Sequence, residues 1–386
     1  MRDLRDEPMA PRTTLHIGGA ARRLIEIDSE PEALSVLGEL RARRAPFFVL
    51  GGGSNMVVAD EGIDLPVLAL RTRAVEETPV RADDGVDRVE VTAAAGEPWD
   101  ALVETCTAEG LSGIECLSGI PGLVGAAPIQ NIGAYGQQIS DCLTRVRVYD
   151  LARDTVEDIA AERCALGYRD SAFKRAWRGR YVVLGVALAL RRAPAAPPRY
   201  AELRQALQDR GAREGQPPPP DEVRQVVLAL RRRKAMVIDP AEPDSRSAGS
   251  FFINPVVDQR GIEAIEQRGR AAGLLGPDDA LPRFDAGEQR VKVPAAWLIE
   301  RAGFARGFGA GAVGLSRKHT LAIVNRGGAS AVALVALART IRDGVRERFG
   351  VTLVPEPVFV GFQADSLPLA RPLPPFSPAE LIPAGR

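Results

Sequence analysis

The sequence has few of the residues that build structural metal sites and disulfide frameworks. Its 386 residues include four cysteines and two histidines, and no C-x-x-C pair occurs. Because such sites need clustered thiol and imidazole ligands, we expect neither a metal site nor a disulfide scaffold. Cys106 falls on the apolar face of a predicted helix, where we expect a thiol in the core.

Long apolar runs and a net charge are also lacking. The longest apolar run, Tyr181 to Leu190, is too short to span a bilayer, and the first ten residues lack the apolar core of a secretory signal. Acidic and basic side chains balance at 50 each, which argues against an overall attraction to nucleic acid or to an anionic membrane. We therefore expect a cytoplasmic enzyme that acts on small molecules, with a monomer slightly favoured.

Glycine and proline are plentiful, and one apolar stretch concentrates them: GIECLSGIPGLVGAAPIQNIGAYG, from Gly113 to Gly136. Glycine lets a backbone turn at positive φ and approach a flat ligand without a Cβ in the way. Its N–H groups can then bind phosphate or ring carbonyl oxygens. The pattern indicates the floor of a flavin site, although a buried glycine-rich crossover between two strands explains the composition about equally well.

A second glycine cluster, LGGGSN, ends at Asn55 and follows the buried strand predicted at Phe47 to Leu50. A dinucleotide-binding fingerprint would need a helix next, but Met56 to Val58 has the pattern of another strand. The loop N–H groups would therefore bind a diphosphate without a helix dipole behind them. A glycine-rich hairpin is the alternative interpretation.

A third cluster, Gly309 to Gly314, satisfies G-x-G-x-x-G. It lacks a predicted strand before it, and a strand rather than a helix is predicted after it. We therefore assign no dinucleotide to this segment.

The remaining pattern predicts strands and helices in two or three domains. A capping box of Ser29 and Glu32 begins a helix that ends near Arg44. A strand pair is expected at Thr14 to Ile27, with further strands at Val89 to Ala95, Thr144 to Tyr149, Tyr181 to Leu190, Thr320 to Val324 and Val351 to Val360. Further helices are expected at Pro98 to Gly110, Asp221 to Lys234, Gly261 to Ala272, Pro294 to Ala302 and Ser330 to Phe349. The segment after Gly361 is expected to be a loose tail.

Six motifs occur in one order along the chain: LGGGSN, IPGLVGAAPIQNIGAYG, YRDSAFK, GSFFINP, VKVPAAWLIERAGF and VPEPVFVG. In this order they resemble the UDP-N-acetylenolpyruvoylglucosamine reductase (MurB) family, flavoenzymes that make UDP-N-acetylmuramate for bacterial peptidoglycan. The resemblance covers the chain from about Thr14 to Gly361. Any one motif is modest evidence, whereas six in order are strong.

The resemblance implies an α+β fold, in which a two-subdomain FAD-binding fold of the vanillyl-alcohol-oxidase (PCMH) type is joined to an α+β substrate-binding domain. It divides the chain into an N-terminal tail (1–13), two FAD-binding subdomains (14–72 and 73–215), a substrate-binding domain with a C-terminal catalytic strand (220–361) and a proline-rich tail (362–386). Proline-rich sequence near residue 215 fits the main boundary.

The resemblance also implies a reaction, in which NADPH reduces noncovalently bound FAD and the enolpyruvyl ether of UDP-N-acetylglucosamine enolpyruvate then takes hydride at its β-carbon. The negative charge that develops needs a preorganised cation, and the carbanion needs a proton. By resemblance, Arg169 and Glu356 stabilise the enolic intermediate and Ser250 donates the proton. Since a serine hydroxyl is a weak acid, this role demands a tightly held geometry.

Simpler interpretations exist for each catalytic candidate. Arg169 could form a structural ion pair, Ser250 could cap a turn or helix, and Glu356 could be a solvated edge residue between two prolines. For the whole protein, the alternatives are a flavin-dependent oxidase or dehydrogenase of the same superfamily acting on an alcohol or hydroxy acid, and a nucleotide-sugar sensor without activity.

The other site residues are also assigned by resemblance. FAD contacts fall on Gly51, Gly52, Gly53, Ser54, Asn55, Gly119, Ile120, Pro121, Gly122, Gly125, Ala126, Asn131, Gly133 and Ala134. Substrate contacts fall on Tyr135, Tyr200, Arg231, Lys234 and Asn254, with Arg231 and Lys234 as a diphosphate-binding pair and Tyr200 on the mobile tyrosine loop of one subtype.

The sequence departs from the family pattern in two places. Ile253 stands where a lysine is common, so one cationic contact is expected to be missing. Ala126 and Ala127 stand where small hydroxyl residues are often found beside the pyrophosphate, which leaves backbone N–H groups to bind it.

Overall fold

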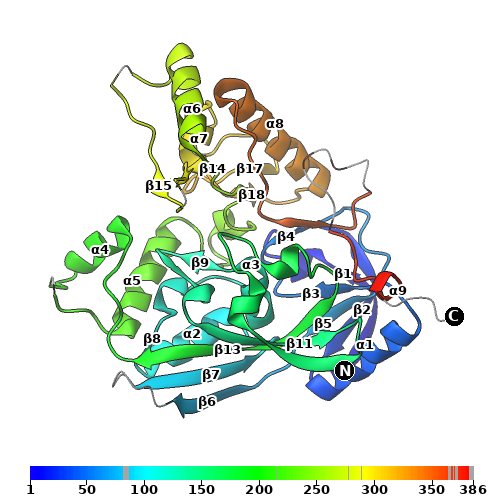
Figure 1. The fold of residues 1–386 in the computed structure, drawn as a ribbon. Helices are drawn as coiled ribbons and strands as arrows, with labels where there is room; N and C mark the ends of the chain where they lie inside the picture. Colours follow the sequence, from blue (N-terminus) through cyan, green and yellow to red (C-terminus); the bar gives the residue numbers. More distant parts are fainter. Residues whose placement is uncertain are drawn as a thin grey trace.

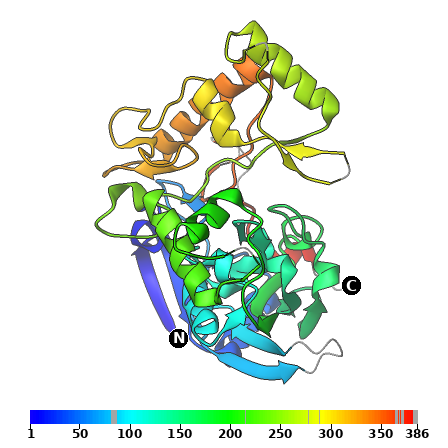
Figure 2. The same ribbon diagram turned by 90° about the vertical axis from the view of Figure 1, so that its left-hand side faces the viewer.

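The computed structural model describes residues 1–80, 87–213, 215–276, 278–287, 289–363, 367, 369 and 373–381. The chain forms two lobes (Figure 1, Figure 2). The lower lobe contains the N-terminal part of the chain and both larger sheets, and the upper lobe contains the helices between residues 259 and 349.

A four-stranded sheet forms one half of the lower lobe. Its strand order is β1 (Arg2–Pro8), β2 (Ala20–Ile27), β5 (Val67–Leu70) and β3 (Phe48–Leu50), with β1 antiparallel to β2 and the other neighbours parallel. Helix α1 (Glu30–Ala42) begins at the predicted cap, where the hydroxyl of Ser29 accepts the N–H of Glu32 at 3.4 Å. The predicted N-cap is confirmed, but the reciprocal half of the box is not, because the Glu32 carboxylate accepts the N–H of Asp28 at 3.0 Å instead of that of Ser29.

Residues 1–13 form an edge strand instead of the expected charged tail. β1 pairs with β2 over its whole length, and the short 3-10 helix η1 (Ala10–Arg12) follows it. Ion pairs such as Arg23 with Asp3, at 2.8 Å, join the two strands, so the charges are satisfied across the sheet edge. The strand pair expected at Thr14 to Ile27 is wrong, because only its second half is a strand and the partner of that strand is β1.

A six-stranded antiparallel sheet forms the other half of the lower lobe. Its order is β12 (Thr155–Ala160), β11 (Leu143–Asp150), β13 (Tyr181–Arg192), β7 (Arg88–Ala94) and β6 (Val75–Val80), with β8 (Leu111–Ser112) beside β13. The strands expected in this part of the chain are confirmed. The glycine-rich stretch contributes only short elements: the 3-10 helices η2 (Glu115–Leu117) and η3 (Val124–Ala126), α3 (Ala127–Gln130) and β9 (Gly133–Ala134). β10 (Gln137–Gln138) follows it and pairs with β9.

Helices pack beside this sheet. α2 (Trp99–Ala108) buries Trp99, Leu102, Val103 and Cys106, so the expected place of the Cys106 thiol in the core is confirmed. α5 (Pro220–Arg233) packs against α2 and against α4 (Ala201–Gln208). Val223, Val226, Val227 and Leu230 of α5 are buried, as their spacing predicts.

The upper lobe has its own core. α6 (Gln259–Ala271), α7 (Ala295–Arg301) and α8 (Ala331–Phe349) surround buried side chains that include Phe251 and Phe252. Two small sheets complete it: β14 (Val256–Val257), β16 (Val291–Lys292) and β15 (Phe284–Asp285) form one, and β17 (Val313–Leu315) with β18 (Ile323–Asn325) forms the other. The three expected helices are confirmed. Over the described ranges, no helix combines the length and apolar character needed to cross a bilayer.

The chain returns to the lower lobe through β19 (Val358–Val360). This strand pairs in parallel with β4 (Met56–Val58), directly after the first glycine loop. The strand expected at Val351 to Val360 is therefore confirmed only in its last part. Because β4 directly follows the loop at residues 51–55, this pairing places the residues just before β19 at the junction of the lobes.

The described residues after Gly361 correct the expectation of a loose tail. The N–H of Leu373 donates to O of Phe359 at 2.6 Å, and Phe376 exchanges two backbone hydrogen bonds with Phe47 and stacks on its ring at 5.2 Å. α9 (Pro378–Leu381) then lies against α1 (Figure 1). Apolar side chains among the prolines hold this segment to the lower lobe. Residues 364–366, 368, 370–372 and 382–386 of the expected tail lie outside the described residues.

Candidate active site

Arg169 and Glu356 meet at the junction of the two lobes. Arg169 lies in the loop between β12 and β13, and Glu356 comes just before β19. Nε of Arg169 is 3.3 Å from Oε1 of Glu356, and the two side chains are only 21% and 16% exposed. The pair thus joins a lower-lobe loop to the segment that returns from the upper lobe.

The glycine-rich stretch holds the Arg169 guanidinium in place. Nη1 donates to O of Asn131 at 3.2 Å, and Nη2 donates to O of Gly133 at 2.6 Å. The Arg169 backbone has φ of 54°, a conformation that few residues with a Cβ adopt and that often marks functional sites. These contacts leave Nε directed at Glu356.

Ser250 lies on the segment that adjoins Glu356. The N–H of Glu356 donates to O of Phe251 at 2.8 Å, and the N–H of Ile253 donates to O of Val354 at 3.0 Å, so the two segments run antiparallel. Phe251 is fully buried and anchors this pairing in the upper-lobe core. The three expected catalytic residues therefore lie on adjoining segments of the chain.

Two polar side chains that the sequence interpretation missed complete this cluster. Nε2 of Gln130 donates to Oε1 of Glu356 at 2.9 Å, and Nζ of Lys174 donates to Oε1 of Gln130 at 3.0 Å and to O of Arg169 at 2.7 Å. Burial lowers the pKa of Lys174, although the charges of Glu356 and Asp170 oppose it. Gln130 occurs inside the motif IPGLVGAAPIQNIGAYG and Lys174 inside YRDSAFK. Lys174 is also one of only four lysines in the sequence, which is a signal that could have pointed to it.

The two glycine-rich loops face each other across a small cavity. A Cβ at Gly52 would lie 2.6 Å from Cα of Gly122, so neither loop has room for a side chain there. Gly51 and Gly52 line a cavity of about 220 Å³ together with Leu123 of the other loop. The bare backbone at Gly51, Gly52 and Gly96, which all line this cavity, fits the approach of a flat, phosphate-bearing group. The residues present therefore fit FAD.

Some of the expected cofactor residues are already bonded to protein. The N–H of Gly119 donates to Oδ1 of Asp100 at 2.5 Å, and its carbonyl accepts from Nη2 of Arg231 at 3.2 Å. The Asn131 side chain donates to O of Gly167 at 2.7 Å and accepts the N–H of Ser140 at 3.3 Å. The polar groups of these two residues therefore shape the loop.

The other expected cofactor residues lie on the same loops. Asn55 also contacts the segment that leads into β19. Its side chain donates to O of Glu356 at 3.4 Å, and its carbonyl accepts the N–H of Val358 at 3.0 Å. Gly125 packs so closely on Ala95 that a Cβ would lie 2.7 Å from the alanine Cβ. The remaining members are Gly53, Ser54, Ile120, Pro121, Ala126 and Ala134.

Three expected substrate residues gather beside this cluster. The rings of Tyr135 and Tyr200 meet edge to face at 5.7 Å, and Nζ of Lys234 is 5.8 Å from the Tyr135 ring centroid. Lys234 also forms an ion pair with Glu202 at 2.6 Å. Burial raises the pKa of Tyr135 to about 12. Phe284 of the upper lobe stacks on Tyr200 at 6.4 Å, so both lobes contribute to this group.

The other two expected substrate residues are placed differently. Arg231 is turned inward beneath Gly119, where burial lowers its pKa, and it donates to O of Met236 at 2.8 Å. The structure therefore does not set Arg231 beside Lys234 on an accessible surface. Oδ1 of Asn254 accepts the N–H of Ala295 at 2.9 Å, which fixes Asn254 at the start of α7.

The arrangement can stabilise an anion and supply a proton. Arg169 is a fixed cation, and Ser250 is a hydroxyl donor on a segment held to Glu356. Among the residues that the structure describes, no group of His, Cys, Asp or Glu side chains could hold a metal ion, and the four cysteines are buried free thiols.

Comparisons with known proteins identify the family of the chain. The FAD binding domain family matches residues 21–160, and the C-terminal domain family of UDP-N-acetylenolpyruvoylglucosamine reductase matches residues 239–360. The chain is 49% identical to UDP-N-acetylenolpyruvoylglucosamine reductase of Thermobifida fusca over 92% of this chain and 98% of that protein. It is 44% identical to the reductase of Streptomyces coelicolor over 94% and 91%.

A solved structure is similar as well. The crystal structure of UDP-N-acetylenolpyruvylglucosamine reductase (MurB) from Thermus caldophilus superposes with a TM-score of 0.58 at 25% identity, covering 93% of this chain and 98% of that one. The likeness extends over both lobes. The expected α+β fold with an FAD-binding part is confirmed.

Proposed function

The chain belongs to the UDP-N-acetylenolpyruvoylglucosamine reductase (MurB) family of flavin-dependent oxidoreductases, and from this premise we propose that it uses NADPH to reduce UDP-N-acetylglucosamine enolpyruvate to UDP-N-acetylmuramate. The loops at residues 51–55 and 119–126 would hold FAD noncovalently, and the bound flavin would carry hydride from NADPH to the substrate. This step of peptidoglycan precursor synthesis would take place in the cytoplasm. The substrates are the only partners that the proposal requires.

Arg169 stabilises the charge that forms when hydride reaches the β-carbon of the enolpyruvyl group. The electron pair moves onto the α-carbon and the substrate carboxylate, so a nearby cation lowers the barrier. The carbonyls of Asn131 and Gly133 hold the guanidinium before substrate arrives, which reduces the reorganisation needed during the reaction. Glu356 hydrogen-bonds the enolic form and fixes Nε of Arg169.

Ser250 donates a proton to the α-carbon and completes the reduction of the double bond. A hydroxyl gives up its proton readily only to a strongly basic carbanion at close range. The antiparallel pairing beside Phe251 supports such a fixed position. Tyr135, Tyr200 and Lys234 would hold the UDP part of the substrate, with the Lys234 ammonium near the diphosphate.

The observation that carries this proposal is the Arg169–Glu356 pair at 3.3 Å, with the Ser250 segment bonded to the Glu356 backbone. Neither an alcohol oxidase nor a sensor without activity requires this combination. It supplies an anion-stabilising cation and a proton donor on opposite sides of one junction.

Anaerobic half-reactions test the proposal. NADPH should bleach the flavin absorbance of the wild-type holoenzyme, and UDP-N-acetylglucosamine enolpyruvate should restore it. Ser250→Ala should keep the first half-reaction and slow the second by about 100-fold or more, the usual contribution of a positioned acid. Restoration at the wild-type rate would remove Ser250 from the mechanism. Flavin that is restored only by oxygen would instead indicate an oxidase.

A further inference from the structure

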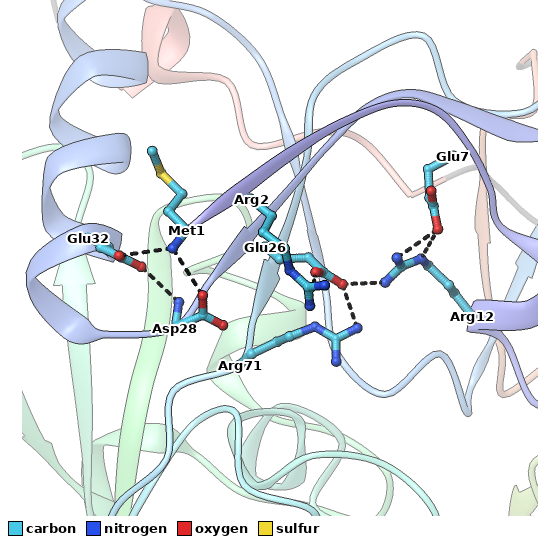
Figure 3. A network of polar contacts seen from close by, with 8 residues as sticks. All are labelled: Met1, Arg2, Glu7, Arg12, Glu26, Asp28, Glu32 and Arg71. Atoms are coloured by element: carbon cyan, nitrogen blue, oxygen red, sulfur yellow. Dashed lines mark hydrogen bonds and ion pairs between the residues drawn. The ribbon is translucent and has the colours of Figure 1, made fainter.

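A buried carboxylate at one end of the first sheet binds three arginines. Glu26 of β2 is 1% exposed and forms ion pairs with Arg2 at 2.5 Å, Arg12 at 2.8 Å and Arg71 at 2.6 Å (Figure 3). The arginines come from β1, from η1 and from the segment after β5. No quoted motif includes any of these four residues.

Further carboxylates surround these arginines. Glu7 also binds Arg12, at 2.9 Å to Nε and 2.7 Å to Nη2. The hydrogen bond from the Met1 ammonium and the charges of Arg2 and Arg71 lower the pKa of Asp28. Burial opposes ionisation of Glu26, but the hydrogen bond from Arg12 and the charge of Arg71 outweigh it and lower the pKa of Glu26. Glu26 therefore stays ionised near neutral pH and holds the three arginines together.

Two of the arginines line the cofactor cavity. Arg12 and Arg71 border the same cavity of about 220 Å³ as Gly51 and Gly52. A guanidinium has five N–H donors, and the contacts of Arg12 with Glu7 and Glu26 use three of them. Arg12 thus keeps donors for a ligand in the cavity.

The backbone fixes Arg12 against the first glycine loop. Gly53 has φ of 64°, and a Cβ there would lie 2.0 Å from O of Arg12. The N–H of Thr14 also donates to O of Gly53 at 3.1 Å. The position of Arg12 is therefore set by the loop itself as well as by Glu26.

We propose that Arg12 and Arg71 bind the diphosphate of FAD and that Glu26 positions both. The first glycine loop is followed by strand β4, so no helix dipole supports a phosphate there. Ala126 and Ala127 also lack hydroxyl donors on the second loop. Arginine guanidinium groups supply the positive charge and the donors that these elements lack, since they bind phosphate oxygens at fixed geometry. The proposal rests on FAD as the cofactor, and it does not depend on which substrate is reduced.

Release of FAD from the holoenzyme tests the two arginines. FAD fluorescence that appears on dilution gives the dissociation constant. Arg12→Ala and Arg71→Ala should each weaken FAD binding by ~10-fold or more, as expected for a lost charge-assisted hydrogen bond, and Arg12→Lys should recover part of the loss.

Arg23→Ala is the matched control. It removes the ion pair with Asp3, which joins the same two strands away from the cavity, and should leave FAD binding unchanged. Wild-type FAD affinity in both arginine variants would overturn the proposal.

Glu26→Gln separates positioning from simple charge. The substitution keeps the side-chain shape and makes the cavity more positive. If Glu26 positions the arginines, FAD should bind more weakly despite the added positive charge. If FAD binds more tightly and Arg12→Ala has its expected effect, Glu26 only reduces the charge of the cavity and its positioning role is wrong. Thermal unfolding of the FAD-free and FAD-bound forms identifies a variant that has merely lost its fold.

Two further measurements test this proposal separately from the proposed function. Riboflavin carries no phosphate, so its binding should be nearly the same in wild type and Arg12→Ala. At saturating FAD, the KM for NADPH should also stay unchanged; a raised KM would assign Arg12 to NADPH instead. Loss of substrate reduction with normal FAD binding in the wild type would contradict the proposed function and leave the assignment of Arg12 intact.

Discussion

We assign catalysis to Arg169, Ser250 and Glu356 (the catalytic corner) and substrate binding to Tyr135, Tyr200 and Lys234 (the tyrosine corner). The two groups are held in different ways. In the catalytic corner, Arg169 donates to two main-chain carbonyls, and Glu356 is bonded through both its backbone and its carboxylate. In the tyrosine corner, Tyr200 is 40% exposed and is held by ring contacts.

This difference matches the tasks that we assign to the two corners. Charge stabilisation and proton donation need atoms fixed to within a fraction of an ångström. Holding a large nucleotide sugar requires a surface that opens and closes. Ring contacts between exposed side chains are weak enough to separate at low cost. Tyr200 and Phe284, which come from different lobes, are such a contact.

The largest expected effect tests the rigid corner. Arg169→Ala should lower kcat for substrate reduction by ~10²–10³-fold, the usual cost of removing a preorganised charge-stabilising donor. The rate of flavin reduction by NADPH should change much less, because no charge on the enolpyruvyl group develops in that half-reaction. Stopped-flow absorbance of each half-reaction provides the measurement.

A matched control lies in the same segment. Arg175 is 59% exposed and pairs with Asp170 at 3.0 Å, so Arg175→Ala removes a guanidinium without touching the catalytic corner. It should behave as wild type. If Arg169→Ala also left kcat unchanged, the contrast between the two corners would have no catalytic meaning.

Sequence reasoning predicted the two glycine-rich loops because their signals are local. Glycines at Gly52 and Gly122 are required where two backbones meet, and such a requirement stays visible in the sequence. The helices were predictable for a similar reason, since the spacing of apolar residues in α5 records which face is buried. The family resemblance then supplied the roles of Arg169, Ser250 and Glu356.

The features that were missed depend on long-range pairing. The charged sequence of β1 is typical of a solvated tail, but in the structure Asp3 pairs with Arg23 on the neighbouring strand. The proline-rich sequence near Phe376 is typical of a loose end, but in the structure Phe376 stacks on Phe47. The family resemblance paired Arg231 with Lys234 but could not show that the Arg231 side chain turns inward under Gly119. Local patterns do not show which distant residue a side chain will contact, whether the two are 20 residues apart, as Asp3 and Arg23 are, or 112, as Gly119 and Arg231 are.

A smaller effect is expected from pH at the tyrosine corner. Burial lowers the pKa of His319 to about 4, and the charges of Lys234, Arg306 and Arg231 add to this. In the unfolded chain the histidine takes up a proton below about pH 6.5, whereas the folded protein resists protonation until about pH 4. The free energy of unfolding should therefore fall as the pH decreases through this window, by up to roughly 3 kcal/mol.

Urea unfolding of wild type and His319→Gln at pH 7 and pH 4.5 measures this contribution. Protonation of carboxylates affects both proteins, so the difference between them isolates the histidine. The variant should lose less stability on acidification. An equal loss of unfolding free energy in both proteins would show that the pKa of His319 is not lowered by burial. The surroundings of His319 beside Lys234 would then be open to water.

The smallest expected effect tests the adaptable corner. Tyr200→Ala should raise the KM for the nucleotide-sugar substrate by about tenfold, equivalent to one aromatic contact, while kcat stays within about twofold because the catalytic corner is held independently. Tyr200→Phe keeps the ring and should recover most of the loss, and Phe284→Ala, which removes the ring partner in the upper lobe, should have an intermediate effect. Steady-state kinetics at saturating NADPH give both constants. A fall in kcat without a change in KM would mean that Tyr200 acts on the chemistry, and the division between a rigid corner and an adaptable one would be wrong.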